Sequence, residues 1–216
     1  LWKTMDEGGY EPRMMATLRR FNGSLFKSRR ALPLAAEDIH ELYVAAMQDW
    51  SDVEPAIFGT LLERALDPRE RSKLGAHYTP RAYVERLVVP TIIEPLRADW
   101  EIVQAHVDDL RRDGRDAEAL QEVQDFHHTL CTTRVLDPAC GSGNFLYVAL
   151  ELMKKLEGEV LEALAALGED QHRLLMEGET VGPRQFYGLE LNKRAVPIAD
   201  LVLWISHLQW HHRQHP

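Results

Sequence analysis

The sequence predicts an α/β fold that is rich in helix, with a helical N-terminal part followed by alternating strands and helices. Two observations indicate this class. The β-favouring run 133–137 leads through a glycine-rich turn into a helical pattern, and the run 185–190 precedes another helix. Strand, helix, strand and helix in this order favour a parallel sheet joined by crossover helices.

The part of the chain before these strands is helical in pattern. Apolar residues recur three and four positions apart over 34–66, which predicts two helices. A longer helical pattern spans 92–130 and is interrupted near Asp113. We therefore expect a helical spacer over residues 1–70 and an α/β unit over residues 71–216.

A further helix is expected to begin at Pro80, because proline suits the first turn of a helix. Its spacing predicts that Val84, Leu87 and Val88 point inward. Pro90 lacks a backbone N–H group and should disturb the end of this helix.

Composition narrows the class of protein. The 216 residues are 45% hydrophobic and 27% charged, as in ordinary globular proteins. No apolar run approaches the roughly 20 residues that a membrane-spanning helix needs. The sequence contains two cysteines, without zinc-ligand spacing, and no targeting signal ahead of Leu1. We expect a cytoplasmic piece of a longer protein, without a metal site.

Charge is unevenly distributed along the chain. The net charge is −9, which argues against nonspecific binding of polyanions by the whole chain. Residues 1–36 carry seven basic and three acidic side chains, a local charge of +4. This stretch could form a basic face, although a solvated helix surface is the simpler interpretation.

The segment from Asp137 to Phe145, DPACGSGNF, carries the sharpest chemical signal. Gly141 and Gly143 permit left-handed backbone angles and a close approach of a ligand to the main chain. The following helix offers unpaired N–H groups at its N-terminus. Leu146 fills the third glycine position of a dinucleotide fingerprint, which disfavours a nicotinamide oxidoreductase.

Two acidic residues stand where predicted strands end. Asp137 closes the first strand and Glu190 the second, although Glu190 follows Gly143 by 47 positions. Carboxylates at this edge suit a cationic group and the paired hydroxyls of a ribose. Helix capping or plain surface charge is the simpler interpretation of either acid alone. Together with the turn, they predict a site for a nucleoside joined to an amino acid.

Three motifs resemble those of a known family. DPACGSGNF is similar to the first cofactor motif of S-adenosylmethionine-dependent N6-adenine DNA methyltransferases, GLELN to their second, and GAHYTP to their upstream element. The segments RFNGSLF and AMQDWSDVEPAIFGTLLERALDPRERSKLGAHYTP resemble the type IIL restriction-modification enzymes and related phage-defence methyltransferases. The resemblance implies the first part of a Rossmann-like class I methyltransferase domain.

The resemblance also implies roles for individual residues. One group would hold the methionine end of the cofactor, a second would line the turn, and a third would bind the ribose and adenine. In that order they are Tyr78 and Thr79; Asp137, Ala139, Gly141 and Gly143; and Glu190 and Leu191.

The family's catalytic element is absent from this sequence. It consists of Asn or Asp followed by two prolines and an aromatic residue, and no such run occurs among the 216 residues. We therefore expect that the parent protein methylates double-stranded DNA through parts outside this chain, and that the chain alone is inactive. A noncatalytic nucleic-acid-binding or assembly module is the alternative.

The remaining reactive side chains have simpler interpretations. Cys140 is interpreted as a small buried turn residue and His77 as a packing residue. The C-terminal histidines lack a carboxylate or cysteine at ligand spacing and are expected to lie in a frayed tail. They are His207, His211, His212 and His215.

Overall fold

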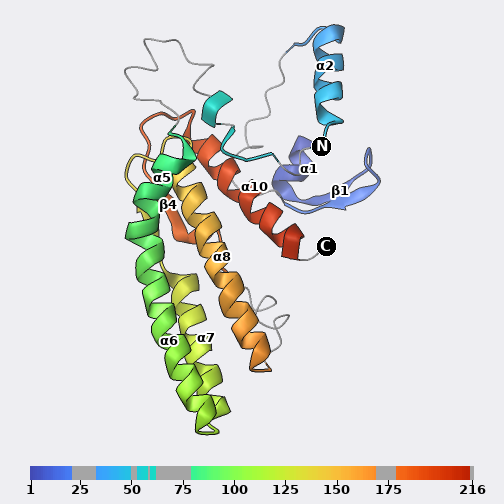
Figure 1. Cartoon of the computed structure of the whole chain (residues 1–216). Helices are drawn as coiled ribbons and strands as arrows, with labels where there is room; N and C mark the ends of the chain where they lie inside the picture. Colours follow the sequence, from blue (N-terminus) through green and yellow to red (C-terminus); the bar gives the residue numbers. More distant parts are fainter. Residues whose placement is uncertain (21–32, 50–52, 58, 62–78, 169–178, 215–216) are drawn as a thin grey trace.

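Helices dominate the computed structural model, and two strand pairs accompany them (Figure 1). The structure describes residues 1–20, 33–49, 53–57, 59–61, 79–168 and 179–214. No helix among these residues has the length and apolar character needed to cross a membrane.

The predicted parallel strand pair is confirmed. Strand β3 is Val135–Asp137 and strand β4 is Phe186–Gly188, with Val135 opposite Phe186 and Asp137 opposite Gly188. Helix α8, Asn144–Ala166, follows β3, and the 3₁₀ turn Pro183–Gln185 leads into β4. Parallel strands need such a long crossover, which explains the wide spacing between the two strand ends.

Three helices between Arg81 and Thr132 lead into β3, as the sequence predicts. Helix α5 is Arg81–Val88, α6 is Glu94–Arg112 and α7 is Asp116–Thr132. Between α5 and α6 the segment Val89–Ile93 forms a π-helical turn. Pro90 cannot donate an intrahelical hydrogen bond, so the helix widens here instead of ending.

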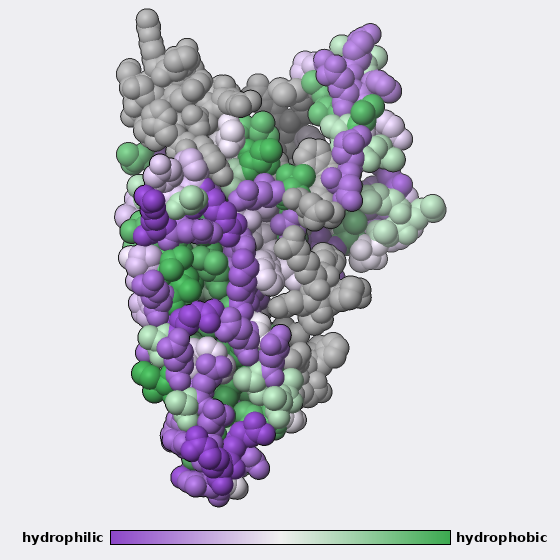
Figure 2. All heavy atoms as spheres, in the orientation of Figure 1, coloured by the Kyte–Doolittle hydropathy of each residue, from purple (hydrophilic) through white to green (hydrophobic). Residues whose placement is uncertain are grey.

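The core lies where α6, α7 and α8 pack together. Trp100 of α6 is fully buried and stacks on Phe126 of α7, with 5.0 Å between ring centroids. Leu130 contributes from α7, and Leu150 and Met153 from α8. Helix α10, Val196–Gln214, packs on α8 (Figure 1). Figure 2 shows hydrophilic side chains gathered at the bottom of the view, at the end where α6 and α7 are joined.

The sheet has one covered and one exposed face. Val135 and Phe186 are buried on the side of α8, whereas Leu136 and Tyr187 are 60% and 47% exposed. Side chains alternate between the two faces of a strand, so the two exposed residues share the other face. Within the described part of the chain, α8 thus covers one side of this sheet.

The N-terminal part differs from a purely helical spacer. Helix α1, Trp2–Glu7, is followed by an antiparallel hairpin of β1, Gly9–Glu11, and β2, Ala16–Leu18. Helix α2, Ala36–Ala46, was predicted, but its apolar residues are exposed. They are Ile39, Leu42 and Tyr43, with Met47 just beyond the helix.

Two further expectations need correction. Leu87 was expected inside, but it is exposed, while Val84 and Val88 are buried. The last helix continues to Gln214, so the histidine-bearing segment up to that residue is helical and not a frayed tail. The expected turn over 21–26 lies outside the described residues. Of the second spacer helix, residues 57 and 59–61 are described, and they are helical.

Candidate cofactor-binding site

The two strand ends remain joined beyond the sheet. The Leu189 N–H group donates to the Asp137 carbonyl at 2.9 Å, and the Cys140 N–H group donates to the Leu189 carbonyl at 3.0 Å. The Asp137 side chain accepts a hydrogen bond from the Ala139 N–H group at 2.9 Å. Such a local bond from an Asp side chain favours a turn, and it fixes the exit of the chain from β3.

Glu190 lies directly against the glycine turn. Its Oε2 accepts a hydrogen bond from the Gly141 N–H group at 2.8 Å, and its Oε1 accepts one from the Asn192 N–H group at 2.7 Å. These bonds fix the carboxylate, while each oxygen keeps a further lone pair. The structure therefore brings the two strand-end acids to one side of the sheet, beside the same turn.

Both turn glycines occupy the left-handed region, with φ of +55° at Gly141 and +84° at Gly143. A Cβ added at Gly143 would lie 3.0 Å from both the Cα and Cβ atoms of Ala199 on α10. A Cβ at Gly141 would meet no described atom within 4 Å. Gly143 is thus required for close packing, and Gly141 for the backbone angle beside open space.

Cys140 is a packing residue of the turn, as expected. It is buried, and a Cβ at Gly188 would lie 2.5 Å from its Sγ, so strand β4 passes close to it. Burial, followed by the charges of Asp137 and Glu190, raises the pKa of the Cys140 thiol to about 11. A thiol with this pKa is a poor nucleophile at neutral pH.

Asn144 joins the turn to the segment before α5. Its Nδ2 donates to the Thr79 carbonyl at 2.7 Å. Its Oδ1 is buried and accepts no hydrogen bond from any residue that the structure describes. A buried acceptor without a donor is costly, so Oδ1 is a polar atom beside the turn that still needs a donor. Asn144 was not predicted as a site residue, although it follows the glycine turn directly.

Most of the residues predicted for the site lie together. Asp137, Ala139, Gly141, Gly143 and Glu190 form the turn and its surroundings, and Thr79 reaches it through Asn144. Leu191 follows Glu190 and is 95% exposed. Tyr78 and His77 lie outside the described residues.

Gly59 contacts Ser142 of the turn, and the sequence did not predict this contact. A Cβ at this position would collide with the Ser142 side chain, so Gly59 packs closely against the turn. No local signal at Gly59 indicates this approach, because it arises from tertiary packing. The N-terminal part of the chain thereby supports the geometry of the site.

A cavity of about 210 Å³ lies apart from the turn, between the segment 53–55 and helices α5, α8 and α10. Of the residues predicted for cofactor binding, none that the structure describes lines it. Its lining includes Arg81, Tyr147 and Glu151, and burial raises the pKa of Tyr147 to about 12. Within this cavity wall, Arg81 Nη1 donates a hydrogen bond to Glu151 at 2.7 Å. These two charged side chains therefore already neutralise each other.

The geometry of the turn fits a ligand with several kinds of polar group. The α8 N-terminus carries a partial positive charge and free N–H groups. Asp137 and Glu190 add negative charge beside it, and Asn144 adds a buried acceptor. A molecule with a diol, a carboxylate and a cationic centre would find partners for each.

The parallel strands, crossover helix and glycine turn define an α/β protein of the class that binds ligands at strand ends. Comparisons with known proteins point to one family. Residues 112–215 match the model of the MmeI DNA-methyltransferase domain. The predicted resemblance to DNA methyltransferases of restriction-modification systems is confirmed.

Individual relatives agree with this assignment. DNA methyltransferase A of Bacillus subtilis (strain 168) is 28% identical over 162 residues, which cover 74% of this chain and 16% of that protein. A putative type II restriction enzyme and methyltransferase of Methanocaldococcus jannaschii is 26% identical over 169 residues, which cover 72% of this chain and 14% of that protein.

A solved structure shares the fold. The type IIL restriction-modification enzyme MmeI, solved in complex with DNA, aligns with a TM-score of 0.72 at 30% identity. The alignment covers 90% of this chain and 24% of that chain. The chain therefore spans less than a quarter of the length of each relative.

Proposed function

We propose that this chain binds S-adenosylmethionine at the turn between β3 and α8, as the first part of a Rossmann-like methyltransferase domain. The protein to which it belongs would transfer the methyl group to N6 of adenine in DNA within a restriction-modification system. The hydrogen bond from the Gly141 N–H group to Glu190 carries this proposal, because it joins the glycine turn to the neighbouring strand-end acid.

Each part of the cofactor has a partner in this proposal. Glu190 accepts hydrogen bonds from the ribose hydroxyls through its remaining lone pairs, and the exposed Leu191 covers the adenine. Asp137 and the unpartnered Oδ1 of Asn144 are the proposed acceptors for the ammonium group, and Thr79 and Tyr78 are the proposed contacts of the methionine end. The glycines of the turn let the main chain approach the ligand.

The bound cofactor supplies an electrophilic methyl group on its sulfonium. The residues of this chain orient it and exclude water, since rate in such a displacement comes mainly from orientation. The acceptors for the target amino group and the surface for a rotated adenine would come from the catalytic element outside this sequence. DNA contacts would also come from parts of the protein outside residues 1–216. The proposed location of the whole protein is the cytoplasm.

Calorimetric titration with S-adenosylmethionine tests the role of Glu190. Glu190→Ala should weaken binding by about 1.5 to 3 kcal/mol, because hydrogen bonds to a charged group contribute this much. Glu162→Ala removes an exposed carboxylate from α8 and is the matched control. Equal affinity in both variants would remove Glu190 from the site.

The reaction itself needs a separate test. The protein extended beyond Pro216 is incubated with duplex DNA and labelled S-adenosylmethionine, and the nucleosides are then separated. We expect the label in N6-methyladenine. A label in methylated cytosine would contradict the proposed specificity while leaving cofactor binding intact.

A further inference from the structure

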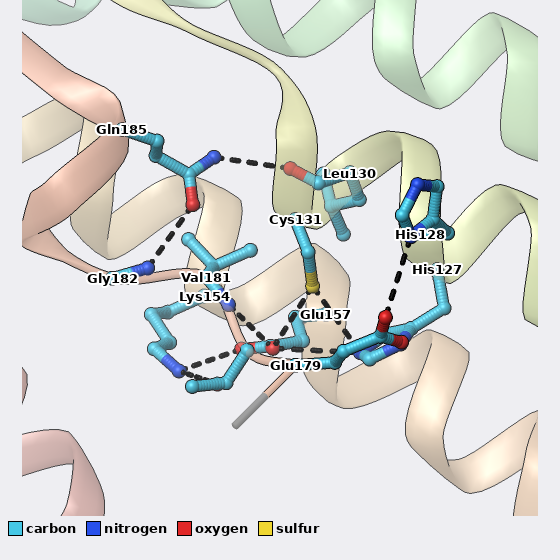
Figure 3. Close-up of polar contacts among 11 residues, drawn as sticks. His127, His128, Leu130, Cys131, Lys154, Glu157, Glu179, Val181, Gly182 and Gln185 are labelled. Atoms are coloured by element: carbon cyan, nitrogen blue, oxygen red, sulfur yellow. Dashed lines mark hydrogen bonds and ion pairs between the residues drawn. The ribbon is translucent and has the colours of Figure 1, made fainter. Parts of the chain in front are cut away.

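A buried group of three potential metal ligands lies away from the turn, between α7 and α8 (Figure 3). His127 and Cys131 stand one helical turn apart on α7, and Glu157 faces them from α8. His127 and Glu157 are each 1% exposed, and Cys131 is half-buried. Nothing in the proposed methyl transfer uses these three side chains.

The distances within this group match those of a metal site. His127 Nε2 lies 3.5 Å from Glu157 Oε1 and 3.6 Å from Cys131 Sγ, and Cys131 Sγ lies 3.9 Å from Glu157 Oε1. A tetrahedral zinc ion holds its ligand atoms about 3.3 to 3.6 Å apart, since its bonds measure about 2.0 Å to nitrogen or oxygen and about 2.3 Å to sulfur. A contraction of a few tenths of an ångström would complete the geometry.

Both oxygens of the Glu157 carboxylate have further partners. Lys154 Nζ donates to Oε2 at 2.7 Å and also to the Thr180 hydroxyl at 2.6 Å. The Val181 N–H group donates to Oε1 at 2.7 Å. Oε1 therefore keeps one lone pair on the side of His127 and Cys131, where an ion would lie.

We propose that His127, Cys131 and Glu157 bind a divalent ion of the zinc class. Imidazole, thiolate and carboxylate together suit zinc, and three protein ligands leave a fourth position for water. Cys131 is the least buried of the three ligands. The ion would tie α7 to α8 and, through Val181, to the segment that enters β4.

The same contacts also allow a simpler role, a buried polar network that needs no ion. In that case Lys154 compensates the charge of Glu157, and His127 and the Val181 N–H group complete the contacts of its carboxylate. The two roles differ in one respect: a metal site requires the Cys131 sulfur to bond directly to the ion. The proposal does not depend on methyl transfer, so its test is independent of the cofactor experiments.

Cobalt titration of the whole chain, stripped of metal with a chelator, tests the proposal. Co²⁺ should give the near-ultraviolet charge-transfer band of a cobalt–thiolate bond together with visible bands of tetrahedral cobalt, and Zn²⁺ should displace both. Cys131→Ser should abolish the charge-transfer band, and His127→Gln should weaken binding more than tenfold. Cys140→Ser and His128→Gln, which alter a second cysteine and a neighbouring histidine, should retain the spectrum.

Lys154→Met provides a second, independent measurement. Removal of the competing ammonium should tighten zinc binding, and zinc should raise the melting temperature of this variant more than that of the parent chain. Circular dichroism verifies that each variant is folded. The proposal is wrong if the parent chain gives no thiolate band, if the band survives Cys131→Ser, or if Lys154→Met binds zinc more weakly.

Discussion

Gly143 and Gly158 differ in backbone conformation and in the space around them. Gly143 has a left-handed backbone, and a side chain there would press against Ala199. Gly158 lies within α8, where an added Cβ meets no atom of the described residues within 4 Å. The sequence pattern marks the first as part of a turn, but the contact with α10 is visible only in the structure.

Replacement of these glycines by alanine should therefore change stability in opposite directions. Gly143→Ala should lower the free energy of unfolding by at least about 1 to 2 kcal/mol, the cost of a left-handed non-glycine residue. Gly158→Ala should raise it by about 0.5 to 1 kcal/mol, because alanine favours the helix interior. Urea unfolding of both variants measures this difference, and a loss of stability in Gly158→Ala would contradict the assigned environments.

At the scale of elements, an ion pair joins α5 to α8. Arg81 Nη1 lies 2.7 Å from Glu151, and Lys155 also reaches this carboxylate at 2.9 Å. Burial acts to raise the pKa of Glu151, but the hydrogen bonds from Arg81 and Lys155 outweigh it, and the pKa falls below 4.5. The pair therefore stabilises the fold at pH values above the ordinary carboxyl range.

This lowered pKa predicts a dependence of stability on pH. The contribution of Glu151 is fully present above about pH 4.5 and is lost as the pH falls through the lowered folded-state pKa. Glu151→Gln should cost about 1 to 3 kcal/mol at pH 7 and progressively less at lower pH. Unfolding at several pH values measures the cost, with the exposed Glu162→Gln as control. A cost that does not change with pH would show that the charge of Glu151 is not involved.

The elements that the sequence predicted best are those with strong local signals. The β-favouring run ending at Asp137, the two glycines and the helical spacing after them sufficed for strand, turn and helix. Contacts between distant segments had no such local signal. The packing of Gly59 against Ser142 and the hydrogen bond from Asn144 to Thr79 both arise from tertiary structure. The exposure of Leu87 was missed because helical spacing identifies an apolar stripe without showing how far the neighbouring elements cover it.

At the scale of the whole molecule, charge limits what this chain can bind by itself. The net charge is −9, and the positive excess is confined to residues 1–36. Affinity for DNA comes largely from neutralised phosphates and falls as salt rises. The chain therefore lacks the overall charge that a tight nonspecific DNA binder needs.

The chain alone should accordingly bind duplex DNA weakly, with little dependence on sequence. Fluorescence anisotropy with labelled duplex at two salt concentrations measures this binding, and the protein extended beyond Pro216 serves as the comparison. Tight, steeply salt-dependent binding by residues 1–216 alone would instead favour the alternative function, a noncatalytic nucleic-acid-binding module.

An NMR titration of the chain with S-adenosylhomocysteine tests the proposed site most directly. The ligand should shift the backbone amide signals of Gly141, Gly143 and Asn144, together with those of Leu191 and Asn192. Signals from the separate cavity near Arg81 should change little. Shifts confined to that cavity, or no shifts at saturating ligand, would contradict the assignment of the β3–α8 turn as the cofactor site.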